Sequence, residues 1–289
     1  MKEKWQSRRL LSLLLILLVL LPVVGLMLTS CAEEPDTLRV LVLDVGQGDA
    51  ILLSQGGHHM LIDTGTATAR SELLGELRQY DVGYLEYLLL THPHEDHVGN
   101  ARAVLEEYHV AQLMTSEEKS DEVAYQLALD AAKKKDCPHN VLKKGETFLL
   151  GSAVCEVLHA GDAEGNDGSV ILRVTFGSNV FLFTGDAEAA AEGALIYRYG
   201  NGESGNRLDC DFLKVGHHGS DTASTAKFLE ATTPLFAAIS CGTDNDYGLP
   251  SDKVLARLAE VGTSVDRTDL SGTLVYISDG NELRQIKKD

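Results

Sequence analysis

The feature that most constrains this sequence is the dense run of imidazole and carboxylate groups in residues 91–97. Three histidines and two acidic residues fall within these seven positions, directly after an apolar, strand-like segment. Alternate side chains of an extended segment point the same way, so His92 and His94 can hold one metal ion together. Asp96 and His97 turn into the following helix and can hold a second ion. Because imidazole and carboxylate ligands suit zinc, manganese or iron better than calcium, the sequence predicts two divalent metal ions, with zinc or manganese expected.

Short β-branched runs alternate with amphipathic segments from residue 38 onward, which is typical of a layered α/β domain. The predicted strands cover residues 38–43, 50–53, 59–62, 87–90, 147–150, 153–158, 170–176, 180–183, 212–215 and 236–240, with a final hairpin around residues 279–280. The predicted helices cover residues 68–80, 99–107, 122–134, 188–197, 225–231 and 252–260. Along the chain, a group of predicted strands followed by helices occurs twice. A four-layer αββα sandwich requires this order, although other α/β folds share it. With 289 residues and 44% apolar content, residues 38–289 can bury one full core and are expected to form a single domain.

The N-terminal segment predicts an exported, membrane-attached protein. Four basic residues precede an almost unbroken apolar run over residues 10–28, as in the n-region and h-region of a secretory signal. The string Leu28-Thr29-Ser30-Cys31 resembles the bacterial lipobox, in which the cysteine is acylated and becomes the first residue after cleavage. We therefore expect a lipoprotein signal peptide at residues 1–30, a short tether at 31–37, and an extracytoplasmic domain anchored to the membrane through lipidated Cys31. An uncleaved transmembrane anchor is the alternative, because the apolar run is nearly long enough to span a bilayer.

The chain is strongly acidic, with a formal net charge of −18, and cleavage after Ser30 would leave about −21. Non-specific affinity for nucleic acid comes mainly from Lys and Arg side chains that neutralise phosphates. An acidic surface therefore repels duplex DNA and anionic lipid at long range, which counts against a nuclease.

The four cysteines after Cys31 show no CxxC or zinc-finger spacing. They are Cys137, Cys155, Cys210 and Cys241. Disulfides can form outside the cytoplasm, but no pairing follows from the sequence, and buried free thiols are the equal alternative.

The string from His92 to His97 matches the HxHxDH signature and resembles the metallo-β-lactamase superfamily. Asp63, in Ile62-Asp63-Thr64-Gly65, resembles the first motif of that family, and Asp186, in Phe183-Thr184-Gly185-Asp186, resembles the fourth. The resemblance covers nearly the whole chain after the leader and implies the αββα metallo-β-lactamase fold. It also implies that Asp186 bridges the two metals, while Asp63 orients a ligating histidine or its loop without binding metal.

Three further sequence strings indicate one subgroup of this superfamily. Asp44-Val45-Gly46-Gln47-Gly48-Asp49 and Lys214-Val215-Gly216-His217-His218-Gly219-Ser220 resemble the extracellular hydrolase domain of ComEC, the DNA-uptake channel, and its free-standing relatives. Asn166-Asp167-Gly168-Ser169-Val170 fits the same subgroup, in which the third-motif histidine of other family members is absent.

The resemblance implies a set of metal ligands that lacks one member. Without the third-motif histidine the first metal lacks a ligand, and His159, Asn166 and Asp167 are the candidates to supply it. His217 is expected as the fifth-motif ligand of the second metal, with His218 as a nearby proton donor or phosphate contact.

The string Tyr247-Gly248-Leu249-Pro250 departs from the ComEC pattern, which usually has histidine before the proline. If that histidine protonates a leaving group or holds a phosphate, Leu249 implies an activity that is slower, retargeted or lost. The remaining histidines are expected at the surface: His58, His109 and His139.

The metal ligands imply a hydrolase in which the two ions hold a bridging water, lower its pKa and stabilise the charge that develops during attack. Asp96 and His218 are the expected catalytic residues. The first hypothesis is a ComEC-like phosphodiesterase or nuclease that acts on single-stranded or incoming DNA.

Two further hypotheses stay open. The acidic surface favours a small ester, lactone or envelope phosphodiester as substrate. Leu249 and the absent third-motif histidine favour a degenerate fold that only binds an envelope ligand or protein partner. A β-lactamase proper does not follow from shared metal ligands.

Overall fold

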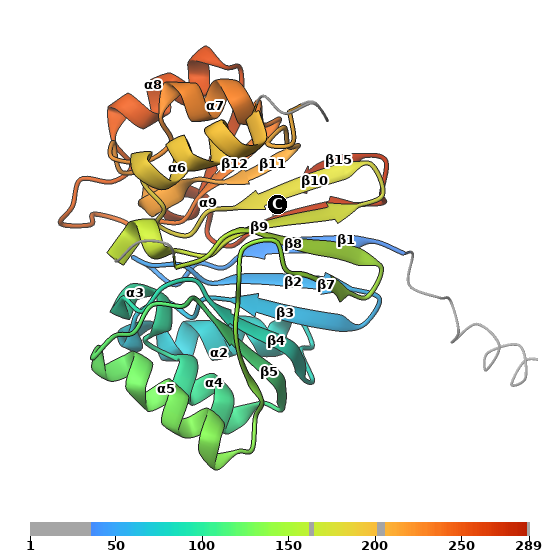
Figure 1. Ribbon diagram of the computed structural model, residues 1–289, viewed down its shortest axis with the longest axis vertical. Coiled ribbons are helices and arrows are strands. Elements are labelled where there is room, and N and C mark those ends of the chain that lie inside the picture. Colours follow the sequence, from blue (N-terminus) through green and yellow to red (C-terminus); the bar gives the residue numbers. More distant parts are fainter. Residues whose placement is uncertain (1–35, 162–164, 201–205, 288–289) are drawn as a thin grey trace, which may run out of the picture. The chain divides into compact units, whose positions relative to one another are not determined.

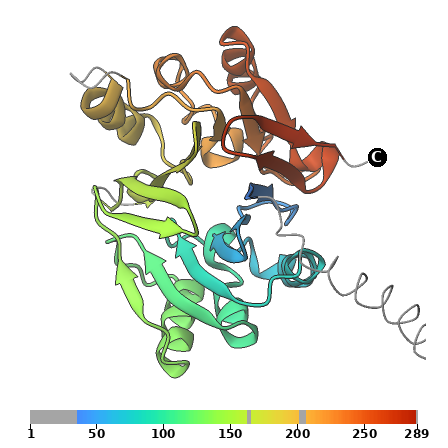
Figure 2. The same ribbon diagram turned by 90° about the vertical axis from the view of Figure 1, so that its right-hand side faces the viewer.

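Two mixed β-sheets pack face to face, and helices cover the outer face of each sheet (Figure 1). This arrangement is seen in a computed structural model, which describes residues 36–161, 165–200 and 206–287. Each sheet together with its helices makes up one half of the sandwich. From a second direction the helices of the two halves again lie on opposite outer sides (Figure 2). The predicted four-layer αββα sandwich is therefore confirmed.

The first sheet has eight strands in the order β15-β14-β1-β2-β3-β4-β5-β6. These strands are β1 (Leu38–Val42), β2 (Ile51–Gln55), β3 (His58–Ile62), β4 (Leu85–Leu90), β5 (Val110–Thr115), β6 (His139–Val141), β14 (Leu274–Ser278) and β15 (Leu283–Ile286). Its accompanying helices are η1 (Ala67–Ala69), α2 (Arg70–Gln79), α3 (Glu95–Val98), α4 (Ala101–Glu107) and α5 (Val123–Lys134). Strands β3 to β6 are parallel, so their carboxyl ends share one edge.

The second sheet has seven strands in the order β13-β12-β11-β10-β9-β8-β7. These strands are β7 (Thr147–Leu150), β8 (Ala153–His159), β9 (Ile171–Phe176), β10 (Asn179–Phe183), β11 (Phe212–Lys214), β12 (Phe236–Ile239) and β13 (Ser264–Arg267). Its helical segments are η2 (Gly165–Gly168), α6 (Ala189–Leu195), η3 (Ile196–Gly200), η4 (Gly216–Gly219), α7 (Ala226–Thr232), α8 (Asp252–Glu260) and α9 (Thr268–Ser271). Strands β10 to β13 are parallel, as are β3 to β6 of the first sheet.

The main core lies between the sheets and is made by side chains that alternate along the strands. In β1, Val40 and Val42 belong to this central core, while Leu41 packs in the layer beneath helices α2, α4 and α5. Phe181 and Phe212 approach the central core from the second sheet. Burying each such side chain stabilises the fold by about 1.5–3 kcal/mol. Alternate side chains of each strand are buried on opposite faces of the sheet, which holds the strand in place. The loops at the strand ends are thereby positioned as well.

Most predicted elements agree with the structure, and the differences have local causes. Strands β5, β6 and β13 were not predicted. Strands β6 and β13 lie at sheet edges with many polar, half-exposed residues, so they lack the apolar signal of a buried strand. The predicted helix at residues 188–197 is α-helical only as far as Leu195 and continues as the π-helical turn η3.

The predicted signal peptide, the tether up to residue 35 and lipidated Cys31 lie outside the described residues. Residues Thr37–Asp289 make up a compact unit of their own. Within the described ranges, no helix combines the length and apolar character needed to cross a bilayer. The cysteines of this unit are free thiols, and three of them are buried: Cys155, Cys210 and Cys241.

Candidate metal centre

Loops from both halves bring acidic and imidazole groups to one edge of the sandwich. The first half contributes the loops after β1, β3 and β4, and the second half contributes those after β10 and β11. Parallel strands end at the same edge of their sheet, and this is where α/β folds bind ligands. The expected site residues lie on these loops.

Four side chains form an inner cluster whose ligand atoms all lie within 4.8 Å of one another: Asp96, His97, Asp186 and His218. His97 Nε2 lies 3.2 Å from Asp186 Oδ1. His218 Nε2 lies 3.2 Å from Asp96 Oδ2 and 3.6 Å from Asp186 Oδ2. His97, Asp186 and His218 are buried, so the cluster is largely shielded from water.

The inner cluster has the donor set and the unsatisfied atoms that a cation requires. His97 Nε2 and Asp186 Oδ1 are both buried and make no hydrogen bond with the described residues. Buried polar atoms without partners are costly unless a proton or an ion compensates them. Two imidazoles and two carboxylates match the ligands of zinc and related transition metals. These residues therefore fit a divalent metal ion.

Three further histidines form an outer cluster beside the inner one: His92, His94 and His217. His92 Nε2 and His94 Nδ1 lie 3.1 Å apart. Asp186 Oδ2 lies 3.9 Å from His92 Nε2 and 3.9 Å from His217 Nε2. The carboxylate of Asp186 thus faces both clusters.

His217 does not lie at the place expected for it, while His218 lies at the cluster. His217 was expected beside Asp96 and His97, but His218 lies there, while His217 faces His92 from across Asp186. Both histidines have left-handed backbones, with φ of 49° and 53°. This conformation costs about 1–2 kcal/mol per non-glycine residue, and such strain clusters at functional sites. It turns the two successive rings apart, with centroids 6.2 Å apart and planes 64° apart.

Among the three candidates for the missing ligand, Asn166 is best placed. Its Nδ2 lies 3.5 Å from His217 Nε2, and its Oδ1 is buried and has no hydrogen-bond partner in the part of the chain that the structure describes. Asp167 instead accepts hydrogen bonds at Oδ1 from the backbone N–H groups of Glu188 and Ala191 at the start of α6. His159 is bonded through Nε2 to the carbonyl of Asp167, 2.8 Å away.

Asp63 connects the two ends of the His-rich loop. Its Oδ1 accepts a hydrogen bond from the backbone of Thr91, and its Oδ2 accepts one from the Thr91 hydroxyl. Oδ2 also lies 2.8 Å from His97 Nδ1, which leaves Nε2 of that ring directed into the inner cluster. A buried carboxylate behind an imidazole fixes the ring's orientation and tautomer.

Asp49 and Lys214 support the second inner histidine, and no role had been predicted for either. Lys214 Nζ lies 2.8 Å from Asp49 Oδ2, and both side chains are fully buried. Asp49 Oδ1 lies 3.3 Å from His218 Nδ1. This ion pair joins the first half to the second directly behind the metal centre. A lysine within the otherwise apolar strand segment of residues 212–215 was the available signal.

Gly48 allows the Asp49 loop to approach the His-rich loop. Its φ is 126°, and a Cβ there would lie 2.3 Å from the carbonyl oxygen of Asp96. The backbone N–H of Asp49 donates to that same carbonyl at 3.1 Å. Any larger residue would push these two loops apart.

The inner cluster has a distinct protonation pattern. Burial opposes the charged form of His97, but Asp186 and Asp63 outweigh it and raise the pKa of this imidazole well above its ordinary value. Burial likewise opposes charge on His218, yet Asp186 and Asp49 raise its pKa to about 10. Burial also raises the pKa of Asp96, but its hydrogen bond with His218 prevails and brings it to about 2. Protons on the two histidines therefore balance the carboxylates, in the positions where a cation would do so.

His92 behaves in the opposite way. Burial and the neighbouring His97 lower its pKa well below the ordinary value, which keeps the ring neutral. A neutral imidazole is the form that binds metal.

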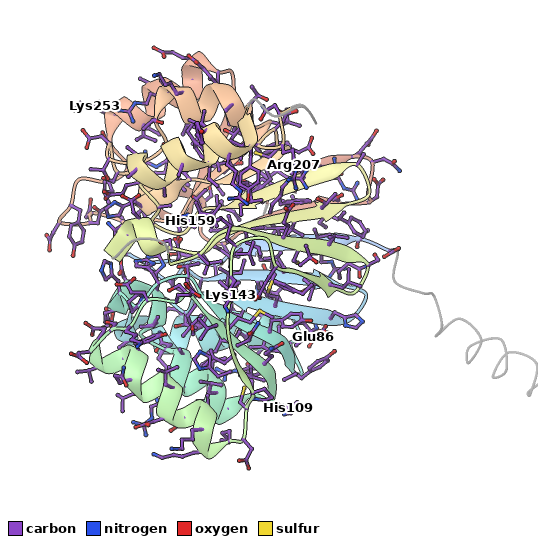
Figure 3. The ribbon with its side chains drawn as sticks, viewed as in Figure 1. Glu86, His109, Lys143, His159, Arg207 and Lys253 are labelled. Atoms are coloured by element: carbon purple, nitrogen blue, oxygen red, sulfur yellow. The ribbon has the colours of Figure 1, made fainter. Side chains whose placement is uncertain are left out.

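The other positions singled out in the sequence lie around this centre or away from it. Pro250 packs against Gly219, and Ser251 donates to the Gly219 carbonyl, so the turn carrying Leu249 adjoins the His217–His218 loop. His109 and His139 are exposed as expected, and His58 is half-buried beside Glu86. Figure 3 shows His109 at the far end of the first half, away from His159.

The fold and this arrangement of ligands define a class of metal-dependent hydrolases. The model of the Metallo-beta-lactamase superfamily matches residues 43–242. The chain therefore belongs to the metallo-β-lactamase superfamily, as the sequence motifs predicted.

Its relatives include competence-type proteins. ComE operon protein 3 of Bacillus subtilis (strain 168) is 31% identical over 261 residues, covering 82% of this chain and 33% of that protein. Competence protein ComA of Neisseria gonorrhoeae is 31% identical over 246 residues, covering 85% of this chain and 33% of that protein. The chain spans about a third of the length of these curated relatives. The predicted ComEC-type resemblance is thus confirmed at the level of homology.

Solved structures share the fold at low sequence identity. The metallo-beta-lactamase fold protein YhfI from Bacillus subtilis aligns with a TM-score of 0.55 at 13% identity, covering 84% of this chain and 100% of that one. CmlA, a diiron beta-hydroxylase from Streptomyces venezuelae, aligns with a TM-score of 0.55 at 15% identity, covering 88% of this chain and 55% of that one.

Proposed function

We propose that this protein is a metal-dependent phosphodiesterase of the ComEC-like kind, which cleaves a nucleic acid strand outside the cytoplasm. The observation that carries the proposal is that Asp186 faces both histidine clusters at once. Support also comes from the competence-type relatives, which are 31% identical over more than four-fifths of this chain.

The side chains divide the work between two ions. Bound divalent cations supply a nucleophile from water at neutral pH and offset charge on the phosphodiester. In this proposal Asp96, His97 and His218 would hold the inner ion. His92, His94 and His217 would hold the outer ion with the help of Asn166 Oδ1, and Asp186 would serve both.

Two carboxylates set the orientation of the inner rings. Asp63 orients His97, and Asp49 together with the carbonyl of Ser240, which lies 3.0 Å from His218 Nδ1, orients His218, so that each Nε2 is directed into the inner cluster. His218 therefore acts as a ligand here, in place of the proton-donor role first expected of it.

The proposal is tested by incubating the purified protein with labelled single-stranded DNA and manganese or zinc. Cleavage is expected, and it should disappear in the His92→Ala/His94→Ala variant. The exposed His109→Ala variant is the matched histidine control and should cleave as well as the unmodified protein. Equal cleavage by the unmodified protein and the double variant would remove the nuclease function.

A small ester, lactone or envelope phosphodiester is the second candidate, and the acidic net charge of −18 favours it over long nucleic acid. Hydrolysis of bis-para-nitrophenyl phosphate without cleavage of DNA would support this candidate. Inertness toward a panel of esters and lactones would exclude its ester and lactone forms.

Leu249 motivates the third candidate, a binding module without turnover. Metal analysis separates it from the enzymes, because close to two equivalents of tightly bound metal together with turnover would exclude a purely binding role.

We also propose that the protein is extracytoplasmic and is anchored to the cell membrane or cell envelope through lipidated Cys31. Replacing this residue in a Cys31→Ser variant should release the protein from the membrane fraction and abolish incorporation of labelled fatty acid. Retention of the variant in the membrane would favour an uncleaved anchor.

A further inference from the structure

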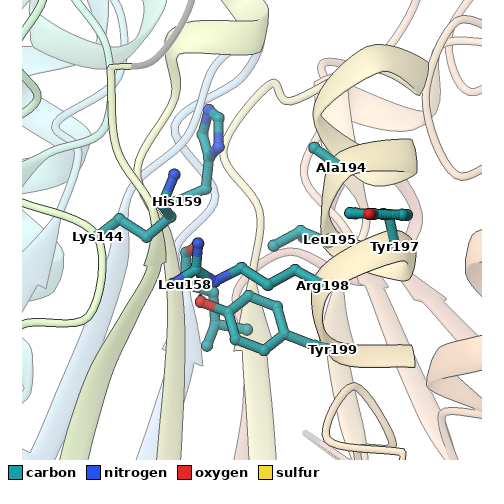
Figure 4. Close-up of a pocket in the computed structure, with 8 residues that line it drawn as sticks. All are labelled: Lys144, Leu158, His159, Ala194, Leu195, Tyr197, Arg198 and Tyr199. Carbon is teal, nitrogen blue, oxygen red and sulfur yellow. Dashed lines mark hydrogen bonds between the residues drawn. The ribbon is translucent and has the colours of Figure 1, made fainter. Parts of the chain in front are cut away.

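A hollow of about 240 Å³ lies between the end of β8 and the α6–η3 segment (Figure 4). His159 and Lys144 line one side of it, and Tyr197 and Arg198 line the other. The hollow adjoins the centre through η2. His159 is bonded to the carbonyl of Asp167 in that segment, and the preceding Asn166 approaches His217.

The residues lining this hollow differ in charge from those of other hollows in the described part of the protein. The described residues that line it include Arg198 and Lys144, of which Lys144 already has an interaction partner, and no carboxylate is described among them. Three other hollows include acidic side chains, such as Glu106, Glu117 and Asp266. In a chain with a net charge of −18, this is a local departure that favours an anionic group.

Arg198 is held in place by an aromatic ring and not by an acid. Its Cζ lies 5.5 Å from the centroid of the Tyr199 ring, and Arg207 lies 5.4 Å from the same centroid. Tyr199 is buried and its hydroxyl donates to the carbonyl of Leu158 at 3.4 Å. Arg207 is paired with Glu156, whereas Arg198 makes no ion pair with the described residues. Stacking thus restrains the guanidinium and leaves its donors for a ligand.

Tyr197 adds an exposed aromatic face next to this cation. It is 92% exposed, which is unusual for so large a ring. It lies on the π-helical turn η3, and such turns are rare and occur frequently at functional sites. An exposed aromatic ring beside an arginine is the arrangement that proteins use to stack an unpaired base and contact its phosphate.

We propose that this hollow is a subsite for the single-stranded nucleic acid that leaves the metal centre. Arg198 contacts a backbone phosphate, and Tyr197 stacks on an unpaired base. The volume is below the roughly 300 Å³ of sites for drug-sized ligands, so it suits one phosphate-bearing unit of a longer chain. Duplex DNA does not fit this mode, because its bases are already stacked and paired. This inference rests on the phosphodiesterase function proposed above, for which it names the substrate form.

Binding is measured by fluorescence anisotropy with a labelled thymidine oligonucleotide and the detergent-solubilised full chain. All proteins carry His92→Ala/His94→Ala, which removes turnover from the measurement. Adding Tyr197→Ala and Arg198→Ala should weaken the Kd about tenfold or more and make its salt dependence shallower by about one phosphate contact. Both residues are exposed, so the fold should persist, and thermal unfolding checks this.

Tyr84→Ala/Arg102→Ala is the matched control, because it removes a partly exposed tyrosine and an exposed arginine from the first half. The control should leave the Kd for the oligonucleotide unchanged. Equal affinity of the Tyr197/Arg198 variant and its parent, an equal loss in the control, or no measurable binding by the parent would each overturn the subsite. Preferred binding of the duplex would overturn the single-strand assignment.

Failure of the proposed function gives a different result. If the unmodified protein hydrolyses neither bis-para-nitrophenyl phosphate nor DNA, the phosphodiesterase proposal fails, while the binding comparison still decides whether the hollow takes a nucleic acid strand.

Discussion

The inner and outer clusters share Asp186 but differ in how their histidines are supported. His97 and His218 are buried, and each has a buried carboxylate behind it, Asp63 or Asp49. In the outer cluster His94 is exposed and His217 is 27% exposed. The acid behind His217 is Glu188, which is 28% exposed and 2.9 Å from its Nδ1.

This difference separates a rigid half-site from an open one. Buried carboxylates fix the inner rings before any ion binds, which reduces the cost of ordering them. Of the outer rings, His94 and His217 face solvent, where a substrate has to enter, whereas His92 is buried. We therefore expect the inner ion to bind more tightly and the outer ion to exchange more readily.

The largest expected effect comes from removing the shared carboxylate. Asp186→Ala withdraws a ligand from both clusters, so hydrolysis of bis-para-nitrophenyl phosphate should fall about a thousandfold or more, since a catalytic ion contributes several kcal/mol to the transition state. Elemental analysis should show loss of metal from both sites. Retention of one tightly held equivalent would instead show that the inner cluster does not depend on Asp186.

The next effect tests the support behind His218. Lys214→Met leaves the Asp49 carboxylate buried without its lysine, which should lower the free energy of unfolding by about 3–5 kcal/mol. Urea denaturation of metal-free protein measures this. Lys253→Met is the matched control, because Lys253 forms an ion pair of 2.7 Å with Asp221 at the surface and should contribute less than about 1 kcal/mol. Figure 3 shows Lys253 at the outer edge of the second half. Similar losses of unfolding free energy in both variants would show that the buried ion pair stabilises the fold no more than the surface pair does.

A smaller effect is expected when the two acids behind the histidines are replaced, and the two replacements should differ in their effect on metal affinity. Asp63→Asn should weaken binding of the inner ion about 10- to 100-fold, because the buried carboxylate fixes His97. Glu188→Gln should change binding of the outer ion by less, because water replaces much of its interaction with His217. Calorimetric titration of metal into apo protein resolves the two affinities. A larger effect of Glu188→Gln would reverse the proposed contrast in rigidity.

The last comparison concerns the pH dependence of metal binding. The pKa of His218 is raised to about 10 and that of His97 is also raised, so both rings carry protons at neutral pH and an inner ion has to displace them. Inner affinity should therefore fall as the pH falls, by about tenfold per pH unit for each displaced proton. The pKa of His92 is lowered, so that ring needs no deprotonation, and outer affinity should change less. Titrations at several pH values with measured proton release test this, and equal slopes would contradict it.

The local sequence was sufficient to predict the α/β class, most strands and helices, and the loop of residues 91–97 as the centre of the site. These features depend on period-two and period-3.6 patterns and on ligands close together in the chain, which are properties of short segments. Asp63 and Asp186 could be named from motifs that follow strands.

Only the tertiary structure decided how distant groups meet. Left-handed backbone at His217 and His218 determines which ring faces Asp96, and side-chain spacing alone does not reveal it. The pairing of Lys214 with Asp49 joins strands and loops 165 positions apart in the chain, and the placing of Asn166 next to His217 depends on how η2 folds. Local propensity carries no information about such contacts, because they form only when both sheets have packed.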